Sequence, residues 1–413
     1  MFFAGIDWAD KEFVIVVVDE QSKVVEHFMV KNNAEGFRRF IDRIRTITPN
    51  ADEILFAIET PNYPVVDYLM DEGYTVYAIN PKSVNRYRDR YRTSGAKDDF
   101  FDAMVLANIL RTDRDRHRPI ASGSDLAREL KILTQDKEKL GQTKSKLTSQ
   151  LRDCLKAYYP EVCNLFGDLA CPSALTFLKS FPTWDDLKKK SEKQLIQFLK
   201  KRKVTSPSLL KKIIHHAQTP PIPIDPVVKR AKSRHMIAIV EQLTSLCDQI
   251  EQYDREIERI LEKHPDKDIF LSLPGAATNL GSRILSQLGD DRSRYQCVSE
   301  VRPLAGVAPV TKQSGNYTHV GFRFGCRKPF RNALQLFAFC SLTRSQWAYR
   351  YYQRHRNMGK THHHALRLLS DRWLRIIFAM WKHCSLYDET IYLATMVKHA
   401  MNQPNDSLVL EKA

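Results

Sequence analysis

The chain has 413 residues, of which 43% are hydrophobic and 27% are charged. These proportions exclude a largely disordered chain, and the length predicts two or three domains because single cores rarely exceed roughly 250 residues. The 64 Lys and Arg residues outnumber the 48 Asp and Glu residues, which gives a formal charge of +16. Such a surplus favours a polyanionic partner, because neutralising phosphates releases bound counterions.

The cysteines and the apolar runs bear on where the protein resides. None of the eight cysteines forms a Cys-x-x-Cys pair, so their spacing fits neither a zinc site nor a disulfide framework. Met1 is not followed by a basic segment and a cleavage site, and the longest apolar runs, such as 14–18, are too short to cross a bilayer. We therefore expect a cytoplasmic protein with reduced thiols and no membrane segment.

The first 112 residues alternate strand and helix patterns. Three strands joined by short polar turns are followed by helix, strand, helix and strand. This is the order of a ribonuclease H-like α/β domain. The predicted strands are 2–7, 13–18, 24–30, 54–58 and 75–79, and the predicted helices are 35–47 and 63–70.

Two later stretches carry apolar residues at alternating spacings of four and three. They predict long helices that pair either with each other, as an antiparallel hairpin, or with a second subunit. A lysine-rich helical insert at 184–212 and a proline-rich break at 219–223 separate them. The spaced residues are Leu126, Leu130, Leu133, Lys137, Leu140, Lys144, Leu147, Leu151 and Cys154, and then Ile239, Leu243, Leu246, Ile250, Tyr253, Ile257 and Ile260.

A third region begins after residue 265. A Pro-Gly turn at 273–276 leads into a helix at 279–288, and backbone amides that open a helix are suited to holding a phosphate. The stretch 315–331 is rich in glycine and basic residues, and apolar helices at 332–339 and 365–381 follow. The three consecutive histidines at 362–364 point in different directions on a helix, so we expect a solvated or RNA-facing cluster rather than a metal site.

Four carboxylates predict a metal centre in the first domain. Asp7 ends the first strand, Glu59 ends the fourth, and Asp99 and Asp102 share one face at the start of a helix. Converging carboxylates need a cation, and hard oxygen ligands on a phosphate substrate favour Mg²⁺, with Mn²⁺ as the alternative. The competing interpretation is structural, since such residues also form turns and complement helix dipoles. Asp98 shares the helical face of Asp102 and is a rival to Asp99.

Basic residues interleave with aromatic residues just before that helix. Such a segment can neutralise phosphates while its rings stack on bases. Together with basic residues of the stretch 315–331, it supplies our candidate nucleic-acid contacts. These are Arg86, Arg88, Arg90, Arg92, Lys97, Arg323, Arg327 and Lys328.

These motifs resemble the DEDD transposases of the insertion-sequence 110 family, which are related to Piv-type DNA invertases. In the first half the resemblance rests on Gly5-Ile6-Asp7, Ile58-Glu59 and 94–103. The second half adds 273–275, 288–290, 304–309 and Gln313-Ser314-Gly315. Two features depart from the family pattern. The usual Lys-Thr-Asp lead-in is Lys97-Asp98-Asp99 here, and 321–327 is more aromatic than expected.

The resemblance implies a fold and a mechanism. It implies a RuvC-like catalytic domain at 1–118 and a coiled-coil middle region at 119–265 with an insert at 184–235. It also implies a mainly α-helical serine transposase domain at 266–395, before a flexible tail at 396–413. Ser314 occupies the position of the family's proposed nucleophile, which forms a covalent phosphoserine link to DNA.

The resemblance also implies partners for the protein. They are donor and target DNA, a structured non-coding bridge RNA that pairs with both, and further copies of the chain in a dimer or tetramer. Such a protein would work in the cytoplasm of a prokaryote, at the nucleoid. We therefore expect an RNA-guided DNA recombinase. The alternatives are a RuvC-like nuclease or junction resolvase without a covalent intermediate, and a non-catalytic nucleic-acid scaffold.

Overall fold

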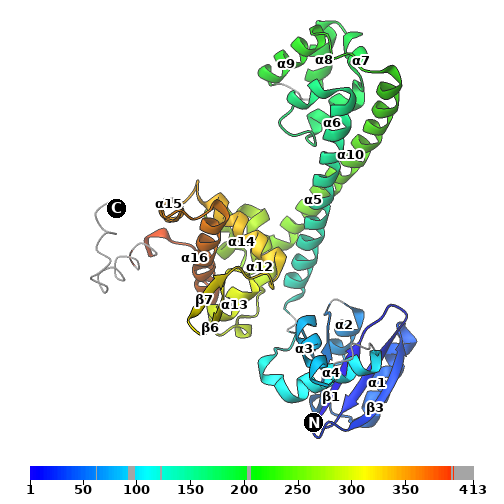
Figure 1. Cartoon of the computed structure of the whole chain (residues 1–413), viewed down its shortest axis with the longest axis vertical. Coiled ribbons are helices and arrows are strands. Elements are labelled where there is room, and N and C mark those ends of the chain that lie inside the picture. The colour runs from blue at the N-terminus through cyan, green and yellow to red at the C-terminus, as the bar shows by residue number, and fades with distance from the viewer. Residues whose placement is uncertain (62, 92–97, 121–122, 202–205, 392–393, 395–413) are drawn as a thin grey trace. The chain divides into compact units, whose positions relative to one another are not determined.

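The computed structural model describes residues 1–413 except 62, 92–97, 121–122, 202–205, 392–393 and 395–413 (Figure 1). It divides into two compact units, Met1–Ser122 and Gly123–Ala413. Each unit is described separately below. Among the described residues, no helix is both long enough and apolar enough to span a membrane.

The first unit is built on a five-stranded sheet in the order β3-β2-β1-β4-β5. Strands β1, β2 and β3 pair antiparallel, whereas β4 and β5 run parallel to β1. This agrees with the predicted order and is consistent with a ribonuclease H-like domain. The strands are β1 (Phe2–Asp7), β2 (Glu12–Val18), β3 (Val24–Lys31), β4 (Ile54–Ile58) and β5 (Thr75–Ala78).

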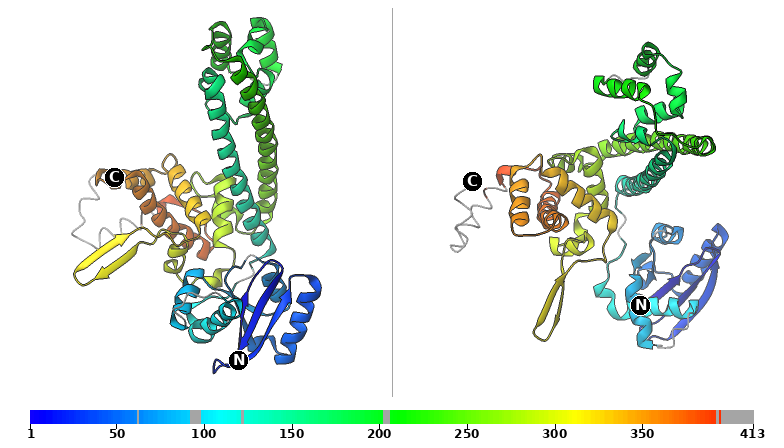
Figure 2. Two further views of the ribbon diagram at one scale, coloured as in Figure 1. Left: turned by 45° about the vertical axis from the view of Figure 1, so that its right-hand side comes forward. Right: turned by 45° about the horizontal axis from the view of Figure 1, so that its top comes forward.

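Helices cover both faces of this sheet (Figure 2). The amphipathic helix α1 (Ala34–Ile47) and α2 (Pro64–Asp71) pack on one face, where Phe40 and Phe56 are fully buried. On the other face lie α3 (Pro81–Tyr91) and α4 (Asp99–Asp113). Single 3₁₀ turns, η1 (Ala51–Glu53) and η2 (Arg114–Arg116), precede β4 and follow α4.

Helix α4 makes an unusually close approach to the sheet at Gly5. A Cβ atom on Gly5 would lie 1.9 Å from the carbonyl oxygen of Ala103 and 2.7 Å from the amide nitrogen of Ala107. Only glycine fits at this point of β1, because the backbone of α4 occupies the space that a side chain would take. The contact fixes the start of α4 beside the carboxyl end of β1.

Two long helices organise the second unit. They are α5 (Asp125–Tyr158) and α10 (Pro226–Lys263). Lys137 contacts Asp254, and the Cys154 thiol donates to the carbonyl of Lys232, so the helices run antiparallel to each other. The sequence leaves open whether the two helices pair with each other or with a second subunit. In this structure they pair with each other.

The helix pair carries a small helical domain at one end. Its core is a separate apolar cluster that includes Leu151, Phe177 and Leu243. The elements are η3 (Pro160–Asn164), α6 (Pro172–Ser180), α7 (Trp184–Lys188), α8 (Glu192–Lys201) and α9 (Pro207–Gln218). The described part of the lysine-rich insert is therefore mainly helical, as its pattern predicts.

A larger helical bundle, with a core around Trp373 and Trp381, packs against the other end of the pair. Its helices are α11 (Lys267–Leu271), α12 (Ala277–Leu288), α13 (Val298–Leu304), α14 (Lys328–Ser341), α15 (Gln346–Asn357) and α16 (His362–His383), with η4 (Arg292–Arg294). The hairpin of β6 (Val310–Ser314) and β7 (Tyr317–Gly321) projects from it (Figure 2). The region is mainly helical as predicted, but neither the hairpin nor α15 was anticipated.

Candidate active site

Asp7 and Glu59 stand at the ends of neighbouring parallel strands. Ile6 of β1 pairs with Ile58 of β4, so the residues that follow, Asp7 and Glu59, occupy equivalent positions. Side chains alternate between the faces of a strand, and Gly5 of β1 faces α4. By the same alternation Asp7 and Glu59 belong to the face of the sheet that α4 covers. Both are half-buried.

Asp102 enters this region from α4. It directly precedes Ala103, the residue whose carbonyl lies over Gly5, and its side chain is almost completely buried. Arg88 of α3 forms an ion pair with the carboxylate, but neither carboxylate oxygen has a hydrogen-bond partner among the described residues. A buried carboxylate that lacks hydrogen-bond donors is costly unless a cation neutralises it. Arg88 is the cation that neutralises Asp102 in this structure.

Asp98 and Asp99 take different positions at the start of α4. Asp98 is the N-cap residue, and its carboxylate accepts a hydrogen bond of 3.1 Å from the amide of Phe100. Asp99 is the first helical residue and is exposed. The capping contact gives Asp98 a structural role that Asp99 does not share.

The carboxylates are not drawn together around a point in this structure. Within the described part of the chain, no three His, Cys, Asp or Glu side chains are close enough to hold one metal ion. Arg88 supplies the positive charge beside Asp102 instead. The sequence pattern placed Arg88 among the nucleic-acid contacts and gave no signal of this pairing.

Ser314 lies at the tip of the hairpin, in the second unit. It is the last residue of β6 and pairs with Tyr317 across a two-residue turn that contains Gly315 at φ +56°. The serine and its neighbours on both strands are exposed. The hydroxyl has no hydrogen-bond partner among the described residues, so its immediate surroundings provide no base.

The candidate nucleic-acid contacts fall into two groups. On α3, Arg86 and Arg90 are exposed, whereas Arg88 turns toward Asp102. Arg92 and Lys97 lie outside the described residues. In the bundle, Arg323 donates from Nε to the carbonyl of Ala308 at 3.2 Å. Arg327 donates to the carbonyl of Gln287 at 3.4 Å, and Lys328 is exposed at the start of α14.

Two other motifs have structural roles. The Pro-Gly turn lies between α11 and α12, with Gly275 at φ +83°, and a Cβ there would be 3.1 Å from the carbonyl oxygen of Cys340 on α14. The turn is therefore packed closely against the backbone of α14, although Gly275 itself remains exposed. The three histidines begin α16 as expected, and His362 shares a hydrogen bond of 2.7 Å with the hydroxyl of Tyr352.

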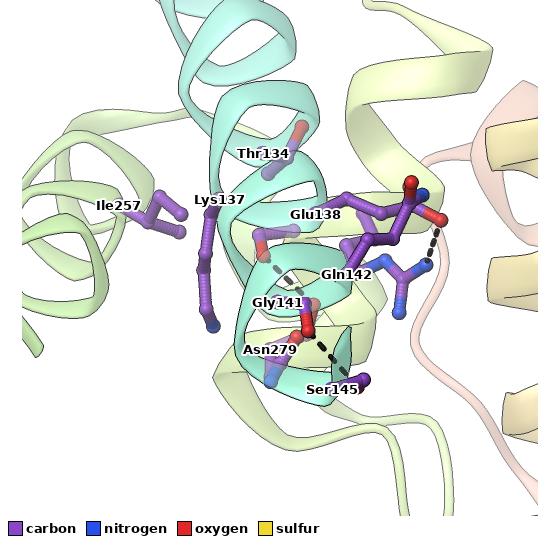
Figure 3. Close-up of a pocket in the computed structure, with 10 residues that line it drawn as sticks. Thr134, Lys137, Glu138, Gly141, Gln142, Ser145, Ile257 and Asn279 are labelled. Carbon is purple, nitrogen blue, oxygen red and sulfur yellow. Dashed lines mark hydrogen bonds and ion pairs between the residues drawn. The ribbon is translucent and has the colours of Figure 1, made fainter. Parts of the chain in front are cut away.

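A polar cleft of about 310 Å³ opens where α5 and α10 meet α12 (Figure 3). Both of its cations are already paired. Arg283 contacts Glu138 at 3.3 Å, and Lys137 contacts Asp254. The cleft thus offers no uncompensated charge to a ligand. Its lining consists of Thr134, Lys137, Glu138, Gly141, Gln142, Ser145, Ile257, Asn279, Ser282 and Arg283.

The sheet order of the first unit is consistent with a domain of the ribonuclease H-like class. Comparison with known families agrees and is more specific. Residues 4–160 match the DEDD transposase model, and residues 267–353 match the model of the IS116/IS110/IS902 transposase family. The chain belongs to this family of transposases, which are enzymes that cleave and transfer DNA strands.

Individual relatives extend the match over nearly the whole chain. A candidate transposase for the IS117 mini-circle of Streptomyces coelicolor is 32% identical over 408 residues, which cover 96% of this chain and 98% of the relative. Uncharacterised proteins of the elements IS116 of Streptomyces clavuligerus and IS900 of Mycobacterium paratuberculosis are 26% and 24% identical. Each covers 93% of this chain, and the chain covers 96% of each relative.

Proposed function

We propose that this transposase cuts and rejoins DNA strands at a composite site, guided by a structured RNA. Asp7, Glu59, Asp99 and Asp102 hold divalent metal, and Ser314 is the nucleophile. The observation that carries the proposal is the position of Asp102. Its carboxylate is buried and paired with Arg88, and it belongs to the helix that packs against β1 at Gly5, on the face of the sheet to which Asp7 and Glu59 also belong.

The acidic group suits phosphate chemistry. Mg²⁺ or Mn²⁺, when bound, neutralises the scissile phosphate and lowers the pKa of a coordinated hydroxyl. The protein holds Asp7 and Glu59 on rigid strand ends, and it holds Asp102 on a helix fixed by Gly5. We expect Arg88 to leave Asp102 when the ion enters. Its guanidinium then faces the DNA backbone.

Ser314 suits the role of a nucleophile that must reach DNA, because it is exposed at the end of a projecting hairpin. In the first step its Oγ–phosphorus bond forms and the phosphorus–oxygen bond to the leaving sugar breaks. The hydroxyl proton passes to solvent or to the leaving oxygen. Attack by the sugar hydroxyl of the second strand reverses these changes, so the recombined strand forms without an external energy source.

The missing local base supports a composite site. A serine hydroxyl needs activation by a base or a metal, and no described side chain hydrogen-bonds to the Ser314 hydroxyl. We propose that the acidic group of a second subunit supplies this activation in a dimer or tetramer. The guide RNA would account for part of the +16 charge, because its phosphates add to those of donor and target DNA.

The absence of a described base beside the Ser314 hydroxyl also favours a second candidate function. The protein would then be a metal-dependent nuclease or junction resolvase that uses water as the nucleophile. Denaturing gels after incubation with labelled element ends distinguish the two. We expect a covalent protein–DNA adduct with the wild-type protein and none with Ser314→Ala. Asp102→Asn should form little adduct and no product. Full recombination by Ser314→Ala would contradict the serine mechanism and favour hydrolysis.

The guide RNA has a separate test. RNA that copurifies with the protein should contain segments complementary to both donor and target DNA, and its digestion should abolish recombination. Recombination at an unchanged rate and site after complete RNA removal would contradict the guided mechanism but leave the serine chemistry intact.

A further inference from the structure

The loop that follows β7 carries two phenylalanines beside a group of arginines. Phe324 is 78% exposed, although large apolar side chains are normally covered. Its ring meets that of Phe322 edge to face, with centroids 4.8 Å apart. Phe322 packs against the bundle, whereas the ring of Phe324 is the exposed member of this aromatic pair.

Two arginines from different helices hold Phe322. The guanidinium carbon of Arg367, on α16, lies 4.2 Å from the ring centroid, and that of Arg331, on α14, lies 5.2 Å away. Such cation–π contacts fix the ring in place. The loop also packs closely at Gly306, where a Cβ atom would lie 2.7 Å from the sulfur of Cys326. The position of the aromatic pair is therefore fixed by packing against the bundle.

The positive charge around this pair has no carboxylate counterion among the residues that the structure describes. Five cations surround the loop, and none forms an ion pair with a carboxylate of another described residue. Arg367 has a buried Nε without a hydrogen-bond partner, and burial, together with nearby Arg331, lowers its pKa. The five residues are Arg323, Arg327, Lys328, Arg331 and Arg367.

Several other cations of the same unit, in contrast, are paired with carboxylates. In the bundle, Arg302 contacts both carboxylate oxygens of Asp371, and Arg292 contacts Asp266. In the polar cleft, Arg283 contacts Glu138. Like charges gathered without acids raise the free energy of the free protein. An external anion would remove that cost.

We propose that Phe324, supported by Phe322 and the five cations, is a stacking site for an unpaired base of single-stranded DNA. The exposed ring offers a face to any base, and the surrounding guanidiniums match the phosphates on either side of it. A duplex is excluded as the occupant because its base faces are covered by their neighbours. DNA is favoured over RNA because transposases of this family cleave and transfer DNA strands, and the loop directly follows the Ser314 hairpin in the chain.

The proposal extends the proposed function, but its test is an equilibrium binding measurement that needs neither guide RNA nor a reactive serine. The full chain is titrated against fluorescein-labelled dT12 and against a blunt duplex of the same length. We expect Phe324→Ala to weaken dT12 binding by roughly fivefold to a hundredfold, the value of one base stack. Duplex binding should not change. Phe324→Trp should preserve dT12 binding because indole also stacks.

A matched control separates stacking from general loss of apolar surface. Phe339, 51% exposed on α14, has no cation–π contact with this group, and Phe339→Ala should leave dT12 binding unchanged. Salt dependence separates stacking from charge. Lys328→Gln should reduce the slope of log affinity against log salt by about 0.7, the value for one phosphate of a single strand. Phe324→Ala should leave that slope unaltered.

Three outcomes would overturn the proposal. They are unchanged dT12 affinity in Phe324→Ala, an equal loss for duplex and single strand, and a loss confined to rU12, which would assign the site to RNA. Binding of dT12 at equilibrium involves no cleavage of a phosphodiester bond, so the measurement does not depend on a reactive serine. Failure of the serine mechanism therefore leaves this measurement interpretable.

Discussion

Gly5 determines how closely α4 can approach the sheet, and through α4 it positions Asp102. The backbone of α4 passes where a side chain would begin, so the smallest substitution forces the helix away from β1. Asp102 then leaves the edge that carries Asp7 and Glu59. The motif Gly5-Ile6-Asp7 therefore contains a packing requirement in addition to the proposed metal ligand Asp7.

We expect Gly5→Ala to lower the free energy of unfolding by about 3 kcal/mol, the upper part of the range for overpacked cores. Urea denaturation followed by circular dichroism measures the change. Gly141, in the middle of α5, is the matched control because a Cβ there meets no atom within 4 Å. Gly141→Ala should stabilise the protein by up to about 1 kcal/mol, through helix propensity. Equal effects of the two substitutions would contradict the packing argument.

At the residue scale the sequence predicts some positions well and others not at all. Asp7 and Glu59 were predictable because parallel strands place their carboxyl ends at one edge. The contact of Arg88 with Asp102 was not, since nothing local shows which distant carboxylate an arginine will meet. Phe324 was noted only as a departure from the family pattern. Its exposure and its arginine neighbours depend on α14 and α16, which are remote in sequence.

At the scale of elements, the two adjacent acids at the start of α4, Asp98 and Asp99, have different roles. Asp98 caps the helix, and asparagine caps as well as aspartate does. We expect Asp98→Asn to keep both stability and recombination, whereas Asp99→Asn should lose recombination by removing a charge from the proposed metal site. Measuring both variants in one recombination assay gives the answer. Loss in Asp98→Asn alone would make Asp98 the third acid.

The end of α10 is tied to the bundle by a buried histidine. His264 is the C-cap residue, its Nδ1 accepts from the amide of Asp266 at 3.1 Å, and burial lowers its pKa despite the nearby Asp266 and Asp290. The folded pKa is below the unfolded value of about 6.5, so the unfolded chain gains the proton first. The free energy of unfolding should therefore decrease as the pH falls from about 6.5 toward the folded pKa.

We expect the melting temperature to fall on acidification through this range, and to fall less in His264→Gln, which cannot gain the proton. Differential scanning calorimetry of the full chain, at several pH values on both sides of about 6.5, measures the two slopes. His235→Gln, at an exposed position of α10, is the control and should retain the wild-type slope. A wild-type slope in His264→Gln as well would exclude His264 as the source of the pH dependence.

The apolar patterns of the strands and helices explain why the sequence predicts some of these elements and not others. The sheet of the first unit was predictable because its strands are buried on one or both faces and show clear apolar patterns. The hairpin was not, since nearly every residue of β6 and β7 is exposed and no face is apolar. Helix α15 is rich in Arg, Tyr and Gln with only two buried residues, so it lacks a marked apolar stripe.

For the whole molecule, the proposed composite site predicts complementation between inactive variants. Asp102→Asn retains the serine, and Ser314→Ala retains the acids. If one subunit's acids act with another's serine, the mixed oligomer contains intact sites that neither variant has alone. We expect each variant to be inactive and their mixture, refolded or coexpressed, to regain part of the recombination activity. A mixture as inactive as its components would place acids and serine in the same subunit.

The hairpin of β6 and β7 has a consequence for when the enzyme can act. Both of its faces are open to solvent, and isolated two-stranded hairpins are marginally stable in water. If Ser314 is the nucleophile, as proposed, its orientation is fixed only when a bound partner holds the hairpin. Ser314 would thus be harmless on free protein and become reactive only on an assembled complex. The exposed hairpin would thus restrict DNA cleavage to the assembled complex and protect the host chromosome from unwanted cleavage.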